Sequence, residues 1–559
     1  MAETLLTALF LPLIAGLMLP RRGARWVALL VALAVLALTA VLVGRYAEGT
    51  AGFAASRLDW LGPATGLDVR FDVALDGLSL WLFALTALLM VVAVLVGWET
   101  IQDRAALYYR LLMLLETGML GVFVARDVIL FYVFFEFTLI PLFFLIGIWG
   151  GPERRRAATK FFLFTFAGSV LTFLGLLAIV LWNYDQPGAG SAVRRLTFSI
   201  PELTVALRAR PMGLGLQVAV FSALFAGFAI KVPLWPLHTW LPLAHVEAPT
   251  AGSVLLAGVL LKVGTYGFAR FNVAMLPQAT AALMPWLLWL ALAGVVYGAL
   301  VALAQSDIKR LVAYSSVSHL GFCMLGLFAV NRLSVQGSVL QMVNHGLSTG
   351  GLFAVVGMLY ERFHTREIGD LGGLARRLPR LSFVTMLLVL SSIALPGLNG
   401  FAGEFLLLLG VFQRGWGQPM PHDWLQLRTI AVLSMSGVIL GAWYMLWMYQ
   451  RVFFAKNETS GDTRPVRDMS LREMLCLTPI VVMVFWIGLQ PRFFLDRMAP
   501  TLNELIRPAM EAVEHRAERG GAASAALKNR RDVVVPHDAV SDGRETGKGW
   551  QSRSWCNSR

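Results

Sequence analysis

Residues 228–267, FAIKVPLWPLHTWLPLAHVEAPTAGSVLLAGVLLKVGTYG, contain two apolar runs, each of which carries a lysine. Lys231 comes shortly before Pro233 and Pro236, and Lys262 lies in the middle of the second run. Proline removes a backbone donor and clashes with the preceding turn of a helix. We therefore expect a helix that breaks next to Lys231, followed by an intact helix with a buried lysine. In a bilayer, a broken backbone is tolerated only inside the protein or along a hydrated cavity.

The composition indicates the environment in which the chain folds. Of its 559 residues, 57% are hydrophobic and 14% are charged, and the mean hydropathy is +0.67. Soluble domains carry about 25% charged residues. This difference excludes a soluble enzyme, a coiled coil, a disordered scaffold and a nucleic-acid-binding protein. The sequence predicts an all-α polytopic membrane protein, and its net charge of +13 is attributed to membrane loops.

About fourteen apolar runs can cross a bilayer, at roughly 20 residues per helix. They cover residues 5–20, 26–44, 78–98, 107–124, 128–149, 158–182, 213–242, 251–271, 282–303, 311–329, 335–360, 382–412, 429–454 and 471–490. The seventh run is broken by its prolines and the twelfth by LPGLNG at residues 395–400. Because the breaks lie five helices apart, helices 4–8 and 9–13 are predicted to form two inverted five-helix repeats.

The predicted organisation has five parts. They are helices 1–3 at residues 1–104, the first repeat at 105–272, the second repeat at 273–457, helix 14 at 458–499 and a polar, disordered tail at 500–559. From about Glu511 the apolar pattern gives way to Ala, Gly and charged residues without periodicity. Lys and Arg are more numerous in the odd-numbered loops, so we expect these loops in the cytoplasm and both termini on the periplasmic side.

The sequence gives no support for a cofactor bound to this chain. Cys323, Cys476 and Cys556 lie far apart, whereas an iron–sulfur cluster needs about four thiolates. Neither GxGxxG nor GxxxxGK[ST] occurs. Zinc ligands usually lie close together in sequence, and no two histidines and no two cysteines have i, i+4 spacing. We therefore expect no redox centre and no metal site.

Ionisable side chains within the apolar runs are the strongest functional signal. A charge at the centre of a bilayer costs about 2.5–3.5 kcal/mol even on a lenient scale. Six such residues fall at similar predicted depths: Glu136, Lys231, Lys262, His319, His345 and Glu404. His238 lies between the two halves of the seventh run, and Glu116 and Arg110 in the fourth run are weaker candidates.

Structural roles are the alternative interpretation for single members of this group. Glu136 and Lys231 can form an ion pair that only joins two helices. His238 and His345 can be hydrogen-bonded core residues, and Glu404 can bind the free amides of a broken helix. Because all these groups share one depth, the collective pattern favours a function.

Proton transfer is the chemistry that these residue types suit. Burial disfavours the charged form of a lysine, and a nearby carboxylate favours it. A change in the separation of Glu136 and Lys231 therefore changes the affinity of the lysine for its proton. We expect a proton to pass from Lys231 through water and hydroxyl groups toward Lys262, His319 and Glu404. Because this row runs parallel to the membrane, it needs half-channels at the two helix breaks.

Four stretches carry a resemblance to a known family. They are FYVFFEFTLIPLFFLIGIWG (131–150), residues 228–267, QSDIKRLVAYSSVSHLGF (305–322) and ALPGLNGFAGEF (394–405). Together they resemble the antiporter-like membrane subunits of respiratory complex I, the proton-pumping NADH:quinone oxidoreductase. The resemblance spans roughly residues 78–454 and is greatest to the M type, which has a glutamate at the position of Glu404 where the L, N and Mrp types usually have lysine.

The resemblance implies a role for each residue that matches the family pattern. The roles are a modulating ion pair (Glu136 and Lys231), a central proton carrier (Lys262), a connecting carrier (His319), an exit carrier (Glu404) and supporting polar residues (His238 and His345). It also implies that flavin and iron–sulfur clusters are held by partner subunits. The expected partners are the L- and N-type and small membrane-arm subunits, the lipid bilayer, protons and water, with no nucleic acid.

The expected function is therefore proton translocation in the bacterial inner membrane, driven by NADH oxidation and quinone reduction in partner subunits. Three alternatives remain open from the sequence: a subunit of an Mrp-type cation/proton antiporter, the membrane arm of a hydrogenase- or formate-linked relative, and a purely structural membrane spacer. Co-purification with flavin and iron–sulfur subunits would separate the first expectation from these.

Overall fold

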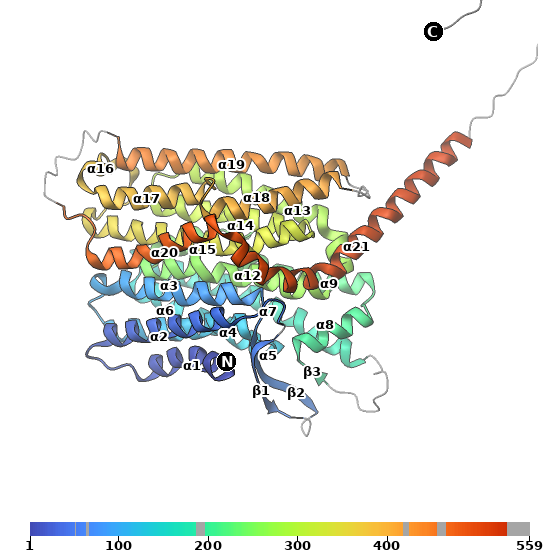
Figure 1. The fold of residues 1–559 in the computed structure, drawn as a ribbon, viewed down its shortest axis with the longest axis horizontal. Helices are drawn as coiled ribbons and strands as arrows, with labels where there is room; N and C mark the ends of the chain where they lie inside the picture. Colours follow the sequence, from blue (N-terminus) through green and yellow to red (C-terminus); the bar gives the residue numbers. More distant parts are fainter. Residues whose placement is uncertain (51, 63–65, 186–195, 418–423, 456–465, 534–559) are drawn as a thin grey trace, which may run out of the picture.

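The computed structural model describes residues 1–50, 52–62, 66–185, 196–417, 424–455 and 466–533. These residues form a bundle of long, nearly parallel helices (Figure 1). Twelve of the described helices are long and apolar enough to cross a membrane, and Ala2–Met18 is a shorter apolar helix beside them. With the interrupted span made of Pro379–Ser392 and Asn399–Trp416, the described residues hold about fourteen spans, which confirms the predicted class.

The spans follow one another in chain order. They are α1 (Ala2–Met18), α2 (Ala24–Arg45), α3 (Ser79–Thr100), α4 (Ala105–Val124), α5 with α6 (Val128–Phe137, Leu139–Trp149), α7 (Arg154–Asp185), α9 with α10 (Leu214–Lys231, Leu241–Glu247), α11, η2, α12 and η3 (Thr250–Leu255, Leu256–Leu260, Leu261–Gly267, Phe268–Val273), α13 (Pro277–Leu303), α14 (Ile308–Phe328), α15 (Arg332–Phe363), α17 with α18 (Pro379–Ser392, Asn399–Trp416), α19 (Trp424–Phe453) and α20 (Leu471–Leu489). Outside the spans lie α8 (Ile200–Ala209), η4 (Ile368–Asp370), α16 (Leu374–Arg377) and α21 (Pro491–Val533).

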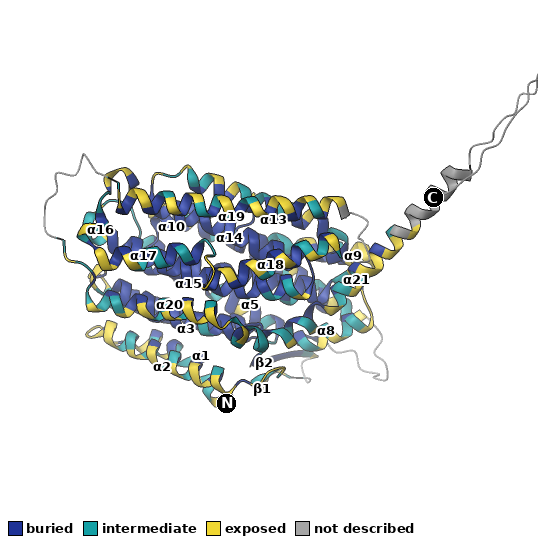
Figure 2. Cartoon of the chain, turned by 45° about the horizontal axis from the view of Figure 1, so that its top comes forward, coloured by how far each residue is buried: buried dark blue, intermediate teal, exposed yellow. Residues whose placement is uncertain are grey.

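The outer surface of the bundle is apolar. Leu30, Val432 and Ile439 are 65%, 57% and 69% exposed, and many exposed positions lie along the outer helices in Figure 2. Soluble monomers rarely expose large contiguous apolar patches. This surface is therefore suited to lipid, as the hydropathy of the sequence predicts.

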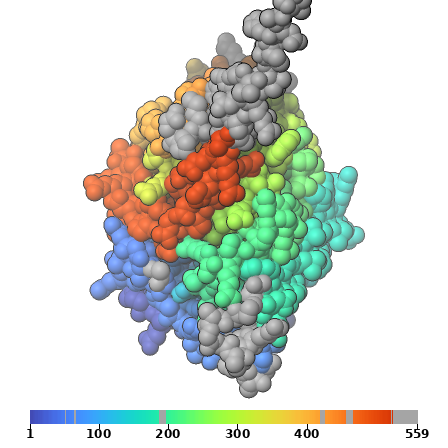
Figure 3. All heavy atoms as spheres, turned by 90° about the vertical axis from the view of Figure 1, so that its right-hand side faces the viewer, coloured from blue at the N-terminus to red at the C-terminus, as the bar shows by residue number. Residues whose placement is uncertain are grey.

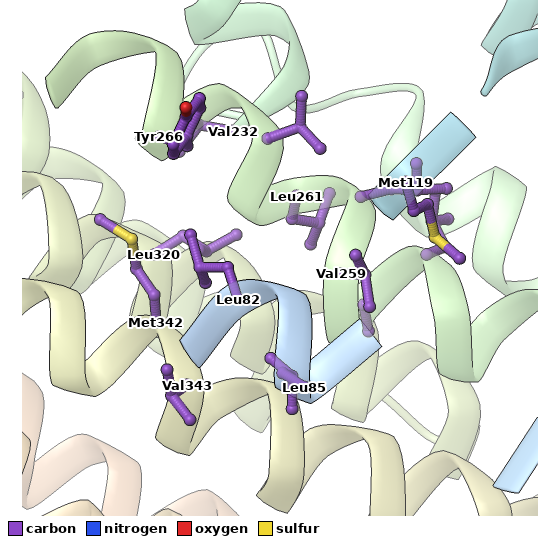
Figure 4. Close-up of a cluster of buried hydrophobic side chains, with 14 of the residues drawn as sticks. Leu82, Leu85, Met119, Val232, Val259, Leu261, Tyr266, Leu320, Met342 and Val343 are labelled. Atoms are coloured by element: carbon purple, nitrogen blue, oxygen red, sulfur yellow. The ribbon is translucent and has the colours of Figure 1, made fainter. Parts of the chain in front are cut away.

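The centre of the bundle is built from α3, the α11–η3 span, α14 and α15, whose residues are mostly buried (Figure 2). Apolar side chains from these helices meet around the middle of the α11–η3 span (Figure 4). Leu82 and Leu85 come from α3, Leu261 from α12, and Val343 from α15. These side chains give the buried polar groups described below a surrounding of low polarity, which strengthens electrostatic interactions between them.

Both predicted helix breaks are present. The helix α9 ends at Lys231 and α10 begins at Leu241, and the Trp240 indole donates to the Ile230 carbonyl over 2.9 Å, which satisfies an acceptor freed by the break. In the twelfth span, the backbone turns at Gly397, whose φ of +91° suits a residue without a Cβ.

A small β-sheet, which the sequence analysis does not predict, lies outside the helical bundle. Strands β1 (Phe53–Leu61) and β2 (Leu67–Leu75) form an antiparallel hairpin in which Leu58 pairs with Phe71. Strand β3 (Leu196–Thr197) pairs in parallel with the start of β2. The hairpin lies at the same end of the bundle as α8 (Figure 1).

The predicted disordered tail is wrong up to Val533. Residues 491–533 form the helix α21, which packs against the bundle (Figure 3) and then projects beyond it (Figure 1). The physical reason is an apolar stripe at helical spacing among the charged residues. Its buried members are Phe494, Met498, Leu502, Leu505, Ile506, Ala509, Val513 and Ala517. Residues 534–559 of the predicted tail lie outside the described residues.

Candidate functional site

Four of the predicted residues form one row: Lys262, His345, His319 and Glu404. The Lys262 Nζ lies 2.6 Å from Nδ1 of His345. The His345 and His319 ring centroids are 5.7 Å apart, and the His319 Nδ1 lies 3.3 Å from a carboxylate oxygen of Glu404. All four side chains are buried. The row runs from the α11–η3 span through α15 and α14 to α18.

His345 has a more direct place in this row than the supporting role that the resemblance implies. Its Nδ1 accepts from a protonated Lys262, and its Nε2 is buried with no hydrogen-bond partner among the described residues. An imidazole that accepts on one nitrogen and donates from the other passes a proton across its ring. Geometrically, His345 therefore lies between the central lysine and His319.

Lys262 is held at an irregular part of its helix. It is 0% exposed, and its Nζ donates to the Ala257 carbonyl within the π-helical segment Leu256–Leu260. Segments of π-helix inside α-helices occur frequently at functional sites, because they leave carbonyl groups without their usual partners. The local backbone therefore supplies one of the two polar contacts of this buried ammonium group.

A polar network surrounds the other end of the row. The His319 Nε2 lies 3.2 Å from the Ser392 hydroxyl and 3.4 Å from the Tyr444 hydroxyl. The Gln341 amide donates to Glu404 over 2.9 Å. These contacts position the two titratable groups and give a proton further donors and acceptors. The sequence analysis does not single out Gln341 or Tyr444, because uncharged polar residues are common in membrane helices.

A small polar cavity lies between the two histidines. Its volume is about 10 Å³, and its lining includes His319, His345, Ser348 and Ser391. A cavity needs roughly 10–15 Å³ and two to four polar partners to hold one water molecule. The space between the two imidazole rings is thus close to the size of a single bridging water.

The predicted modulating pair, Glu136 and Lys231, does not form a direct contact. No hydrogen bond or ion pair within 4.0 Å joins Glu136 and Lys231 in the part of the chain that the structure describes. The Lys231 Nζ instead lies 4.4 Å from the centroid of the Phe135 ring, and its strongest charged neighbour is Glu136. One oxygen of Glu136 is buried with no hydrogen-bond partner. The two groups interact electrostatically without touching.

The remaining candidates lie outside the row. His238 is 4% exposed in the break of the seventh span, and its ring packs edge-on against Tyr297 with centroids 5.1 Å apart. Glu116 is fully buried in α4, and neither carboxyl oxygen has a partner among the described residues. No group of three or more His, Cys, Asp or Glu side chains arranged to hold a metal ion occurs in the described ranges.

Comparisons with known proteins identify the family. Residues 125–421 match the family described as NADH:quinone oxidoreductase/Mrp antiporter, TM. The NADH-quinone oxidoreductase subunit M of Rhodobacter capsulatus is 40% identical over 489 residues, which cover 87% of this chain and 91% of that protein. The chain belongs to the subunit M family of complex I. The subunit M of Escherichia coli (strain K12) is 39% identical over 444 residues, 78% of this chain and 82% of that protein.

Solved structures agree with membership of the subunit M family. A chain of respiratory complex I from Thermus thermophilus with bound NADH superposes with a TM-score of 0.78 at 33% identity, over 90% of this chain and 99% of that chain. A chain of the Mrp complex from Dietzia sp. has a TM-score of 0.75 at 18% identity, over 92% and 99%, which shows the shared fold alone. As a member of the subunit M family, this chain is a multi-pass membrane subunit of complex I and acts with other subunits.

Proposed function

We propose that this chain moves protons across the membrane through the row Lys262, His345, His319 and Glu404, with Glu136 and Lys231 controlling delivery to it. The observation that carries the proposal is the close succession of buried titratable groups from Lys262 to Glu404. Four such groups inside one apolar bundle serve stability poorly, because each one costs free energy to remove from water. Proton transfer gives a reason for keeping them together.

The pair Glu136 and Lys231 acts as a switch in this proposal. Because the two groups interact electrostatically but do not touch, a small helix movement can either close an ion pair or separate it further. Approach of the carboxylate favours the charged lysine, and withdrawal favours release of its proton. Lys231 lies directly before the break in its helix, where the backbone can absorb such a movement. His238 supports this region.

The row from Lys262 onward then carries the proton laterally. A neutral Lys262 takes up a proton and passes it to Nδ1 of His345. The proton on Nε2 of His345 leaves toward His319, directly or through a water in the small cavity. His319 delivers the proton to Glu404, which lies in the first half of α18 after the second break and releases the proton to the opposite side of the membrane.

The same proposal includes the energy source, the membrane location and the neighbouring subunits of this chain. Energy comes from NADH oxidation and quinone reduction in partner subunits, which hold the flavin and iron–sulfur clusters, and this chain holds no redox cofactor. The chain lies in the bacterial inner membrane with both termini on the periplasmic side, beside L- and N-type and small membrane-arm subunits. Residues 105–272 and 273–457 are its two inverted repeats, between residues 1–104 and the helix at 458–499.

The test is a pair of substitutions at Lys262 in the assembled complex. Lys262→Ala removes the central carrier, and Lys262→Arg keeps a positive charge that does not release its proton at physiological pH. We expect both variants to lower NADH-driven proton uptake into vesicles by about 100-fold, since a positioned acid–base group contributes roughly 100- to 10,000-fold. Lys160→Ala is the matched control, because the Lys160 ammonium lies outside the row and donates to the Thr239 carbonyl. Normal pumping by either assembled Lys262 variant would refute the proposal.

A further inference from the structure

His245 is a buried titratable side chain that the proposed row does not use. It lies near the end of α10, is 0% exposed, and has no hydrogen-bond partner at either ring nitrogen among the described residues. A buried polar group without a partner costs about 1–3 kcal/mol. Two such atoms on one side chain call for an explanation, such as a transient partner.

A cavity of about 300 Å³ lies next to His245. Val246, Glu247 and Ala248, which directly follow the histidine, line it, as do Lys309 and Arg366. The rest of its lining comes from the ends of α3, α6 and α15, from the residues after them, and from the starts of α4 and α11. These segments belong to the odd-numbered loops, which the charge distribution assigns to the cytoplasm. At about 30 Å³ per molecule in the liquid, the cavity has room for several waters.

His245 interacts electrostatically with three titratable groups, Lys309, Lys262 and His345. Of these, Lys309 lines the cavity, and its Nζ donates to the Ala248 carbonyl over 2.6 Å. Lys262 and His345 belong to the proposed row. His245 is therefore within electrostatic range both of a lysine that lines the cavity and of the central lysine of the row.

We propose that His245 is the proton relay that connects this cavity with Lys262. One ring nitrogen takes a proton from water in the cavity, and the other nitrogen gives its proton through an intervening water to a neutral Lys262. The imidazolium thus returns to a neutral imidazole, and no covalent bond other than N–H is made or broken. This inference rests on the proposed function, because it gives the source of the protons that Lys262 carries.

A purely structural role of His245 would require only a ring that packs well, whereas the relay requires its nitrogens. The imidazole of His245 stacks on Phe353, with ring centroids 4.6 Å apart and an angle of 8° between the rings. Its carbonyl accepts from the Ser253 hydroxyl over 3.1 Å, a contact that any residue at position 245 can make. A flat apolar ring would therefore satisfy the packing and would avoid the two unpartnered nitrogens. The relay needs the nitrogens themselves.

The experiment separates these roles in the whole complex. His245→Phe keeps the stacked ring and removes both nitrogens, and His364→Phe is the matched control at an exposed histidine. NADH-driven proton uptake and electron transfer are measured in vesicles at equal complex content. We expect His245→Phe to lower the initial rate of proton uptake at least tenfold and the control to leave it unchanged.

His245→Ala keeps the inference testable if the phenylalanine variant fails to assemble. Its shortened side chain leaves a space beside the cavity, and added imidazole should restore at least half of the lost rate. Pyrazole, a ring of the same size and a much weaker base, should not. Normal uptake by His245→Phe, or equal effects of imidazole and pyrazole on His245→Ala, would overturn the inference. The Lys262→Ala variant separates the failure of this inference from the failure of the proposed function. If Lys262→Ala loses proton uptake while the His245 variants keep it, only the relay is refuted. If Lys262→Ala keeps normal proton uptake, the proposed function is refuted.

Discussion

Replacing His345 by leucine should break the proton row at its narrowest link. The Lys262 Nζ would lose the nitrogen that lies 2.6 Å away. The next titratable group is His319, whose ring centroid lies 5.7 Å from that of the lost imidazole. Direct transfer between heavy atoms needs a separation of about 2.6–3.2 Å. Leucine fills most of the vacated space with apolar atoms, so that neither a side chain nor a water spans the gap.

The expected size of the effect follows from this gap. A positioned acid–base group contributes roughly 100- to 10,000-fold to a transfer rate. A 100-fold loss corresponds to about 2.7 kcal/mol in the barrier. We therefore expect proton translocation through this chain to fall about 100-fold or more. Because His345 lies inside the long helix α15 and leucine has a high helix propensity, the substitution should leave the helices in place.

The assay uses the purified complex in proteoliposomes. NADH oxidation is followed by absorbance and proton uptake by a pH-sensitive dye, at equal content of assembled complex. His515→Leu is the control, because the His515 side chain is 75% exposed on α21. Proton uptake within twofold of the unsubstituted complex in assembled His345→Leu would refute the argument that protons pass through this imidazole.

Three further predictions test other parts of the account. Glu136→Gln should lower proton uptake severely while the complex still assembles, because the switch loses its charge; unchanged uptake would exclude this role. Arg270→Met should destabilise the complex by about 3–5 kcal/mol, because the Asp76 carboxylate loses the guanidinium that lies 2.6 Å away. Thermal melting of the complex measures this effect, and an unchanged melting temperature would contradict it. Gly227→Val should push α7 and α9 apart and lower the yield of assembled complex, because a Cβ at position 227 would lie 2.3 Å from the Gly168 carbonyl oxygen. A normal yield would show that the two helices can adjust.

The sequence predicts the membrane class and most of the site, because charges in apolar runs are visible without coordinates. Lys262, His319 and Glu404 each stand out in this way. The order in which these side chains contact one another cannot be predicted from the sequence, because it depends on how four helices pack. The place of His345 between Lys262 and His319 is such a case. The separation of Glu136 from its lysine also depends on packing rather than on sequence spacing.

Two other features lie beyond the sequence analysis for different reasons. The helix α21 has apolar residues three or four positions apart among many charges, so its average hydropathy resembles that of a tail. His245 lies between Pro242 and Glu247, where a polar loop is the natural expectation. Only the fold shows that this residue is fully buried and within electrostatic range of two lysines, Lys309 and Lys262.

The most direct test of the account is the position of ordered water in a high-resolution map of the complete complex in lipid. The account predicts a water between the His345 and His319 rings and a hydrated connection from Lys231 to Lys262. It also predicts that Glu404 faces the protein interior. Apolar side chains that close both gaps, or titratable side chains turned toward lipid, would contradict it.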